Sequence, residues 1–220
     1  MCIRDSYFPM RLDHVSYVAN HDQISDVVQR IGSQLGTAFV DGGIHPRFGT
    51  RNFTASLLNG QYIEVVCPLD HPAAEATPWG KAVTKKANEG GGWLTWVFST
   101  KDISRIEEKF GRPATAGQRK RPDGSQLEWK QLGVIEIADQ PELPFFIQWL
   151  SSDHPSVDGK AHAEITKIEI AAKGELDESW FKDDIHAALR DLEVNWVDPS
   201  TVDGESGIVS VGFSNGAVIS

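Results

Sequence analysis

Two apolar stretches of this 220-residue sequence each contain one polar side chain that could take part in chemistry. Glu64 lies within residues 62–67, and Gln148 lies within the more apolar residues 145–150. A carboxylate among apolar neighbours is costly unless a partner or a metal ion stabilises its charge; the alternative for Glu64 is an outward-facing position on a half-exposed strand. The amide of Gln148 can donate as well as accept, which suits a hydrogen bond to a substrate at least as well as a bond to a metal ion.

Four further side chains have types that could bind a metal ion or a polar substrate. His14 occupies one position of the alternating segment 12–19, where a lone histidine is more often a hydrogen-bonded core or surface residue than a ligand. Thr50 and Asn52 begin a predicted strand, where they could orient a polar substrate or only shape the turn. Arg119 opens the dense basic run of an acidic chain, so it either lies on a solvated hairpin or clamps a carboxylate in bidentate geometry.

Hydrophobic periodicity predicts the elements that must position these side chains. Residues 12–19 alternate as a strand, and apolar residues then recur at helical spacing over 24–35. Three short strands complete this first unit, at 38–41, 52–58 and 62–67. The same order restarts with a strand at 94–98, a helical stripe over 103–110, one long strand or two over 127–138, and a closing strand at 144–150.

The two units form an internal repeat. Residues 15–24 align with residues 94–103 without gaps, at a shift of 79 residues. Both units also end on the tripeptide Asp-His-Pro, where turn chemistry explains His71 and His154 as structural residues. A repeat of this size indicates a duplicated module.

This organisation predicts an α+β fold of tandem β-α-β-β-β modules. We expect a two-module domain over residues 9–156, with modules at about 9–75 and 90–156, followed by a partial third β-α-β-β module over 162–220. Residues 1–8 have no periodicity and are interpreted as a non-native or disordered leader. The chain stops within a predicted strand, so we interpret its C-terminus as incomplete.

The repeat, with Leu12-Asp13-His14-Val15 on its first strand and Tyr62-Ile63-Glu64-Val65 on its fourth, resembles the vicinal oxygen chelate superfamily, and within it the glyoxalase-like domains. The resemblance implies that two modules enclose a cup in which a divalent metal chelates neighbouring oxygens of a substrate. Its ligand positions correspond here to His14, Glu64, Trp93 and Gln148. An indole cannot ligate, so His14, Glu64 and Gln148 remain as the expected ligands and Trp93 is expected to form part of the cup wall.

A histidine nitrogen with carboxylate oxygen suits Zn, Mn, Fe or Ni, and three protein ligands with open positions are typical of a catalytic site. His45 could supply a missing ligand, or it could act as the base if Glu64 does not. The resemblance therefore predicts a small-molecule enzyme of lyase, isomerase or dioxygenase type, in which Thr50, Asn52, Trp93, Arg119 and Gln148 contact the substrate. The alternative is a metal-free protein of the same fold that binds or sequesters a small molecule.

Composition excludes several other classes of function. The chain carries 21 basic and 31 acidic residues, and the resulting net charge of −10 disfavours nucleic acid as a partner. It has no apolar segment long enough to span a membrane, no secretion signal and no Gly-rich phosphate loop, so we expect no membrane partner and no nucleotide cofactor. Its two cysteines cannot form a disulfide framework, which favours a cytoplasmic location. The resemblance also implies a homodimer, because superfamily cups are often completed by dimers.

Overall fold

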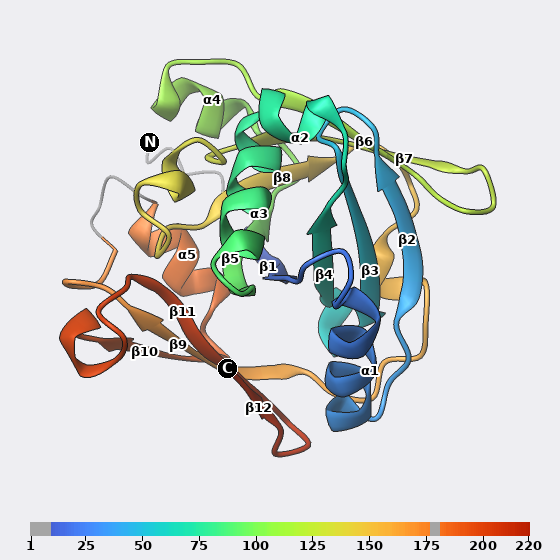
Figure 1. Ribbon diagram of the computed structural model, residues 1–220. Helices are drawn as coiled ribbons and strands as arrows, with labels where there is room; N and C mark the ends of the chain where they lie inside the picture. Colours follow the sequence, from blue (N-terminus) through green and yellow to red (C-terminus); the bar gives the residue numbers. More distant parts are fainter. Residues whose placement is uncertain (1–9, 177–180) are drawn as a thin grey trace.

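The computed structural model describes residues 10–176 and 181–220, so the predicted leader at residues 1–8 lies outside the described residues. The described part has an α+β fold in which eight strands close into a barrel and four more form a second sheet (Figure 1). Its strands are β1 (Arg11–Val18), β2 (Val40–His45), β3 (Thr50–Ser56), β4 (Tyr62–Pro68), β5 (Gly92–Ser99), β6 (Thr115–Lys120), β7 (Gln126–Leu132), β8 (Phe145–Trp149), β9 (Ile165–Ala171), β10 (Glu193–Val197), β11 (Gly207–Phe213) and β12 (Val218–Ile219). Its α-helices are α1 (Ile24–Leu35), α2 (Pro72–Ala76), α3 (Pro78–Asn88), α4 (Ser104–Phe110) and α5 (Lys182–Ala188).

The barrel consists of two equivalent halves, which confirms the predicted tandem modules. Its strand order is β1-β4-β3-β2-β6-β7-β8-β5. In each half the first strand pairs in parallel with the fourth, β1 with β4 and β5 with β8. The halves meet along an antiparallel β1–β5 pair and along a second seam between β2 and β6.

The second seam depends on a glycine. β2 and β6 are joined at the pair Ile44 and Lys120. Gly43, next to this pair, has φ of 96°, and a Cβ there would overlap the backbone carbonyl of Lys120. A side chain at residue 43 would therefore push the two halves of the barrel apart.

Two strands of the second half, and the helix before it, differ from the prediction. The strand expected over 127–138 ends at Leu132 because Gly133, with φ of 103°, turns the chain, and a short 3-10 helix follows at Glu136–Ala138. Strand β6 was not expected, because its two buried positions are Gly117 and Arg119 and its sequence therefore shows no apolar alternation. Helix α3 was also missed, although Thr77 caps it by accepting a hydrogen bond from the Gly80 amide at 3.2 Å and Pro78 occupies its first turn.

Strand β5 separates two hydrophobic cores. Trp96 and Phe98 belong to a core that continues into the second sheet, where the ring of Trp196 lies 6.2 Å from that of Trp96. Leu94 and Val97 belong to the other core, together with the buried face of α3. The second sheet, in the order β10-β9-β11-β12, thus covers the outside of the barrel, and α3 packs against β1, β4 and β5. The division into a domain over 9–156 and a third module over 162–220 stays a prediction.

Candidate active site

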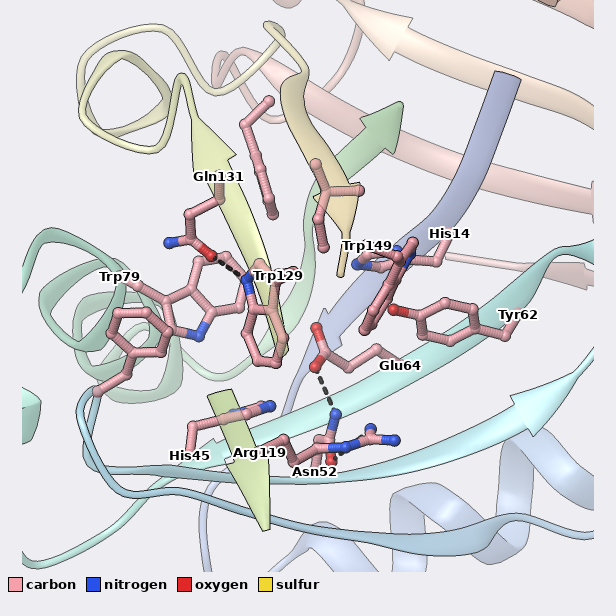
Figure 2. A pocket seen from close by; sticks show the side chains of 13 residues that line it. His14, His45, Asn52, Tyr62, Glu64, Trp79, Arg119, Trp129, Gln131 and Trp149 are labelled. Carbon is pink, nitrogen blue, oxygen red and sulfur yellow. Dashed lines mark hydrogen bonds between the residues drawn. The ribbon is translucent and has the colours of Figure 1, made fainter. Parts of the chain in front are cut away.

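A pocket inside the barrel brings together most of the polar side chains identified from the sequence (Figure 2). The rings of Trp79, Trp129 and Trp149 form part of its wall. The free space at its centre is about 30 Å³, which holds a few water molecules or the small end of a substrate. The residues with polar groups that line it, besides these indoles, are His14, His45, Asn52, Tyr62, Glu64, Arg119 and Gln131.

Glu64 is a buried carboxylate with two hydrogen-bond donors. Its strand β4 runs parallel to β1, in the register that pairs Ser16 with Glu64. Ser16 Oγ donates to Oε2 at 2.7 Å, and Asn52 Nδ2 donates to Oε1 at 2.6 Å. Burial raises the pKa of Glu64. The nearby His14 and His45 and the two hydrogen bonds together lower it by more than burial raises it, so the pKa lies below its usual value. The side chain is therefore an anion at neutral pH.

Arg119 places a buried cation beside this carboxylate. Its side chain is 2% exposed, and its Nη1 donates to Asn52 Oδ1 at 3.2 Å. Nε and Nη2 have no hydrogen-bond partner among the described residues, although Nη2 lies 3.8 Å from a carboxylate oxygen of Asp158. Burial lowers the pKa of Arg119, and the electrostatic effects of Tyr62 and Glu64 oppose this shift. The guanidinium keeps its charge and has N–H groups free to bind an anion.

Gly42 makes room for the Asn52–Arg119 pair. A Cβ at this position would collide with Oδ1 of Asn52 and lie 2.7 Å from Nη1 of Arg119. The glycines at 42 and 43 thus serve the site and the seam of the barrel, respectively.

His45 is a buried and neutral imidazole. It is 4% exposed, and its Nδ1 lies 2.8 Å from the hydroxyl of Thr50 on the neighbouring strand. Burial lowers the pKa of His45 to about 4, with Glu64 opposing the shift and Arg119 adding to it. Thr50 does not line the pocket and acts on it through this contact with His45.

His14 is held in place by a ring and a carboxylate. Its imidazole stacks on the Tyr62 ring at a centroid distance of 4.3 Å, and its Nδ1 lies 2.9 Å from Asp13 Oδ1. This contact leaves Nε2 as the nitrogen available to the pocket. Burial raises the pKa of Asp13, but the hydrogen bonds with His14 and His154 lower it more strongly. The pKa therefore lies well below its usual range, and Asp13 is ionised at neutral pH.

His154 has a second role besides its turn. As expected for a structural turn residue, it accepts a hydrogen bond from the Ser156 amide, at 3.2 Å. Its Nε2 also lies 3.2 Å from Asp13 Oδ2, so Asp13 joins His14 in the pocket wall to a histidine near the surface. Sequence spacing gave no signal for this contact, because residues 13 and 154 are far apart along the chain.

Gln148, expected as a ligand, and Trp93, expected in the cup wall, are not among the residues that line this pocket. Gln148 Oε1 accepts from the Ile103 amide at 3.1 Å and its Nε2 donates to the Lys101 carbonyl at 2.9 Å, so this amide serves the start of α4. Trp93 packs edge-on against Tyr17 on the side of the second sheet and donates to the Ile219 carbonyl at 2.9 Å. Irregularities in the β1–β5 register disturb the alternation that the repeat alignment assumed.

The residues present do not fit the expected divalent metal. The described residues contain no group of three or more His, Cys, Asp or Glu side chains placed to hold a metal ion. His14 can offer Nε2, and each oxygen of Glu64 accepts one hydrogen bond. Strand β8 of the second half contributes Phe145, Ile147 and Trp149 to the pocket, and none of the three can ligate. His45 also lines the pocket, but in the described part of the chain His14, His45 and Glu64 do not form a group of the three ligands that a catalytic site of this kind needs.

Several lining residues were not identified from the sequence. On β7, Leu127, Trp129 and Gln131 are buried and alternate with exposed residues. This alternation is visible in the sequence and could have assigned Trp129 and Gln131 to the inner face. Tyr62 could have been found in the same way, since it lies two residues before Glu64 on one face of β4.

Comparisons with known proteins agree with this architecture. A family model described as Glyoxalase-like domain matches residues 12–182, more than half of the chain. The crystal structure of a hypothetical protein from Staphylococcus aureus superposes with a TM-score of 0.63 at 17% identity, covering 95% of this chain and 97% of that chain, and so shares its fold. Methylmalonyl-CoA epimerase from Mycobacterium tuberculosis matches with a TM-score of 0.44 at 15% identity, over 67% of this chain and 91% of that chain. Among curated proteins no relative matches, and no helix in residues 10–176 or 181–220 has the length and apolar composition needed to cross a membrane.

Proposed function

The chain belongs to the glyoxalase-like domain family of the vicinal oxygen chelate superfamily, and from this premise we propose that it is a small-molecule enzyme that transfers a proton in the barrel pocket without a metal ion. One observation carries the proposal. A buried carboxylate, Glu64, and a buried guanidinium with unpaired N–H groups, Arg119, flank the same small pocket. Such a pair supplies a base and a site for the negative charge that a base creates.

Glu64 acts as the base in this proposal. It accepts a proton from a carbon next to a substrate carbonyl, and the C–H electron pair moves into the carbonyl to give an enolate oxygen. The two hydrogen bonds from Ser16 and Asn52 leave other lone-pair positions on the carboxylate for this proton. Returning the proton to another carbon gives an isomerase, and expelling a leaving group from the neighbouring carbon gives a lyase.

Arg119 holds the substrate oxygens, including the enolate. Its charge lies in a pocket with little water, where an ionic hydrogen bond is stronger than in solution. Asn52 orients both charged groups, because its amide bonds to Glu64 and its carbonyl to Arg119. The neutral His45, steadied by Thr50, can donate or accept a hydrogen bond at the substrate without adding charge.

The expected metal chemistry has less support than this proton transfer. A dioxygenase of this superfamily would need a metal held by His14, Glu64 and a third ligand, and among the described residues these two and His45 do not form a group placed to hold a metal ion. The second candidate is a metal-free binding protein. The small central space and the aromatic wall favour it, since both suit tight enclosure of a small ligand.

Solvent exchange separates these two functions. We would incubate small 2-oxo acids and 3-oxo acids with the protein in deuterated buffer and follow loss of the proton next to the carbonyl by NMR. The proposal predicts deuterium incorporation by the wild type and a loss of at least about 100-fold in Glu64→Gln, the scale of general base catalysis. Glu128→Gln is the matched control, because Glu128 is an exposed carboxylate on β7.

Two results would count against the enzyme. Exchange at equal rates in the wild type and Glu64→Gln would remove Glu64 as the base. Binding of these acids without any exchange would favour the binding protein. A cytoplasmic location and a homodimer stay predictions.

A further inference from the structure

A second hollow shares three lining residues with the pocket. The space inside the barrel is about 30 Å³, too small for more than the reacting end of most metabolites. A neighbouring hollow of about 240 Å³ lies at the N-terminal end of α3 and the end of β7. Phe48, Trp79 and Gln131 line both spaces. A substrate held at Glu64 would therefore have its remaining atoms in this outer hollow.

The lining of the outer hollow contains two basic side chains, although the chain has a net charge of −10. Its lining includes Arg47 and Arg112 and, among the described residues, no carboxylate. Arg47 is exposed and uses Nη1 to donate to the Ala116 carbonyl at 3.0 Å. Arg112 Nη2 lies 2.7 Å from Glu136 Oε2, which neutralises part of its charge but leaves further N–H groups. Two guanidinium groups without a lining acid attract an oxyanion.

Gln131 provides a donor at the junction of the two spaces. Trp129 Nε1 donates to Gln131 Oε1 at 2.7 Å, and an indole nitrogen can only donate, so the carbonyl of Gln131 must face Trp129. The amide nitrogen then points away from Trp129 (Figure 2). This Nε2 has no hydrogen-bond partner in the described part of the chain, although Gln131 is only 7% exposed. Because Gln131 lines both spaces, this donor is placed to bond to a ligand that occupies them together.

We infer that the two spaces form one elongated binding site, and that its substrate carries a second oxyanion, a carboxylate or a phosphate, that binds Arg47 and Arg112 in the outer hollow. The inference rests on the proposed function, because the first acidic or carbonyl end is placed at Arg119 and Glu64. Gln131 would hydrogen-bond to the linking part of the substrate. The ligand class is then a small molecule with two polar ends rather than a compact or wholly apolar one.

Binding of simple acids tests the inference without a known substrate. We would measure dissociation constants by tryptophan fluorescence for linear dicarboxylates of four to eight carbons, for monocarboxylates of the same lengths, and for ω-phosphorylated carboxylates. At the best length, the wild type should bind the doubly anionic acids at least about tenfold more tightly than the matched monocarboxylate. The phosphorylated and dicarboxylate series identify which oxyanion fits the outer end.

The variants locate this preference. Arg47→Gln should abolish the preference for doubly anionic acids, and Arg112→Gln should reduce it. Lys160→Gln, at an exposed lysine outside both spaces, should leave this preference unchanged. Because Arg112→Gln also breaks the pair with Glu136, Arg47→Gln carries the test, with its melting temperature measured alongside. No preference for a second anion in the wild type, or an equal preference in Arg47→Gln, would overturn the inference.

A failure of the proposed function would look different. Arg119→Lys should weaken the binding of monocarboxylates and dicarboxylates alike, because both place a carboxylate in the pocket at Arg119. If Arg119→Lys leaves monocarboxylate binding unchanged, the role of Arg119 in the proposed function is wrong, while the comparison with Arg47→Gln still reports on the outer hollow.

Discussion

The side-chain amide of Asn52 donates to Oε1 of Glu64 at 2.6 Å while its carbonyl accepts from Arg119 at 3.2 Å. These two contacts allow only one orientation of the amide, since a carboxylate only accepts and a guanidinium only donates. Asn52 thus separates a buried anion from a buried cation by one neutral group. Each charge is stabilised, and each keeps capacity for a substrate.

Asn52→Leu should destabilise the protein through both charges. The substitution keeps the approximate volume but removes one of the two hydrogen bonds to the Glu64 carboxylate and the hydrogen bond from Arg119 to Asn52. We expect a loss of about 2–3 kcal/mol in the free energy of unfolding at pH 7. We also expect a rise in the pKa of Glu64, because a hydrogen bond that lowers it is removed. Urea denaturation and an NMR titration of the carboxyl carbon measure the two effects.

Asn195→Ala is the matched control for this prediction. Asn195 makes a side-chain hydrogen bond to Glu193 in the second sheet, in an exposed setting. Its substitution should change stability by less than about 0.5 kcal/mol. Equal effects of Asn52→Leu and Asn195→Ala would contradict the account of a coupled buried pair.

Stability should fall on acidification because of His45. Burial lowers the pKa of His45 from 6.5 to about 4 in the folded protein, so between these values the unfolded chain binds a proton that the folded protein does not. Stability is therefore complete above about pH 6.5 and decreases as the pH falls toward 4, by on the order of 3 kcal/mol. Urea denaturation at a series of pH values from 7.5 to about 4 measures the slope.

His45→Gln should flatten the pH dependence in this window. Glutamine keeps an amide that can bond to Thr50 but has no group that titrates there. His162→Gln serves as the control, because His162 is exposed. A pH slope that persists unchanged in His45→Gln would show that another group causes it.

Gln148→Ala should affect folding rather than ligand binding. Its amide satisfies the Ile103 amide and the Lys101 carbonyl at the start of α4, so its loss should lower stability by about 1 kcal/mol. Binding of small carboxylates in the pocket should stay as in the wild type. The exposed Gln126→Ala provides the baseline for both measurements. Weaker carboxylate binding at unchanged stability would instead return Gln148 to the site.

The sequence predicted the fold well because its strongest signals are local and repeated. The period of two over 12–19 and the helical spacing over 24–35 are visible without tertiary information, and the repeat shows them twice. Closure of the barrel could not be predicted from the sequence, because the β2–β6 seam depends on the close approach of Gly43 to the backbone of Lys120, which is distant along the chain.

Of the residues that the sequence suggested for the site, some line the pocket and others do not, because the face on which a strand residue lies depends on register. His14, His45, Asn52, Glu64 and Arg119 all line the pocket. Glu64 was identified because it is a charge among apolar neighbours and because of the family resemblance, and its strand β4 pairs with β3 without a shift of register. In β5 the alternation is interrupted, and a one-residue change of register turns a side chain to the opposite face, which misplaced Trp93. Gln148 looked like a pocket residue because its apolar neighbours gave no sign that it caps α4.

Metal content tests the central claim that Glu64 and Arg119 act without a metal ion. The protein would be purified without chelator or affinity nickel and analysed for Zn, Mn, Fe and Ni beside His14→Ala and Glu64→Ala. We expect far less than one ion per chain, with the same trace in all three proteins, because the described residues form no group of three side chains placed to hold a metal ion. Close to one ion per chain in the wild type, lost in both variants, would contradict the account and establish a metal chelate in the barrel.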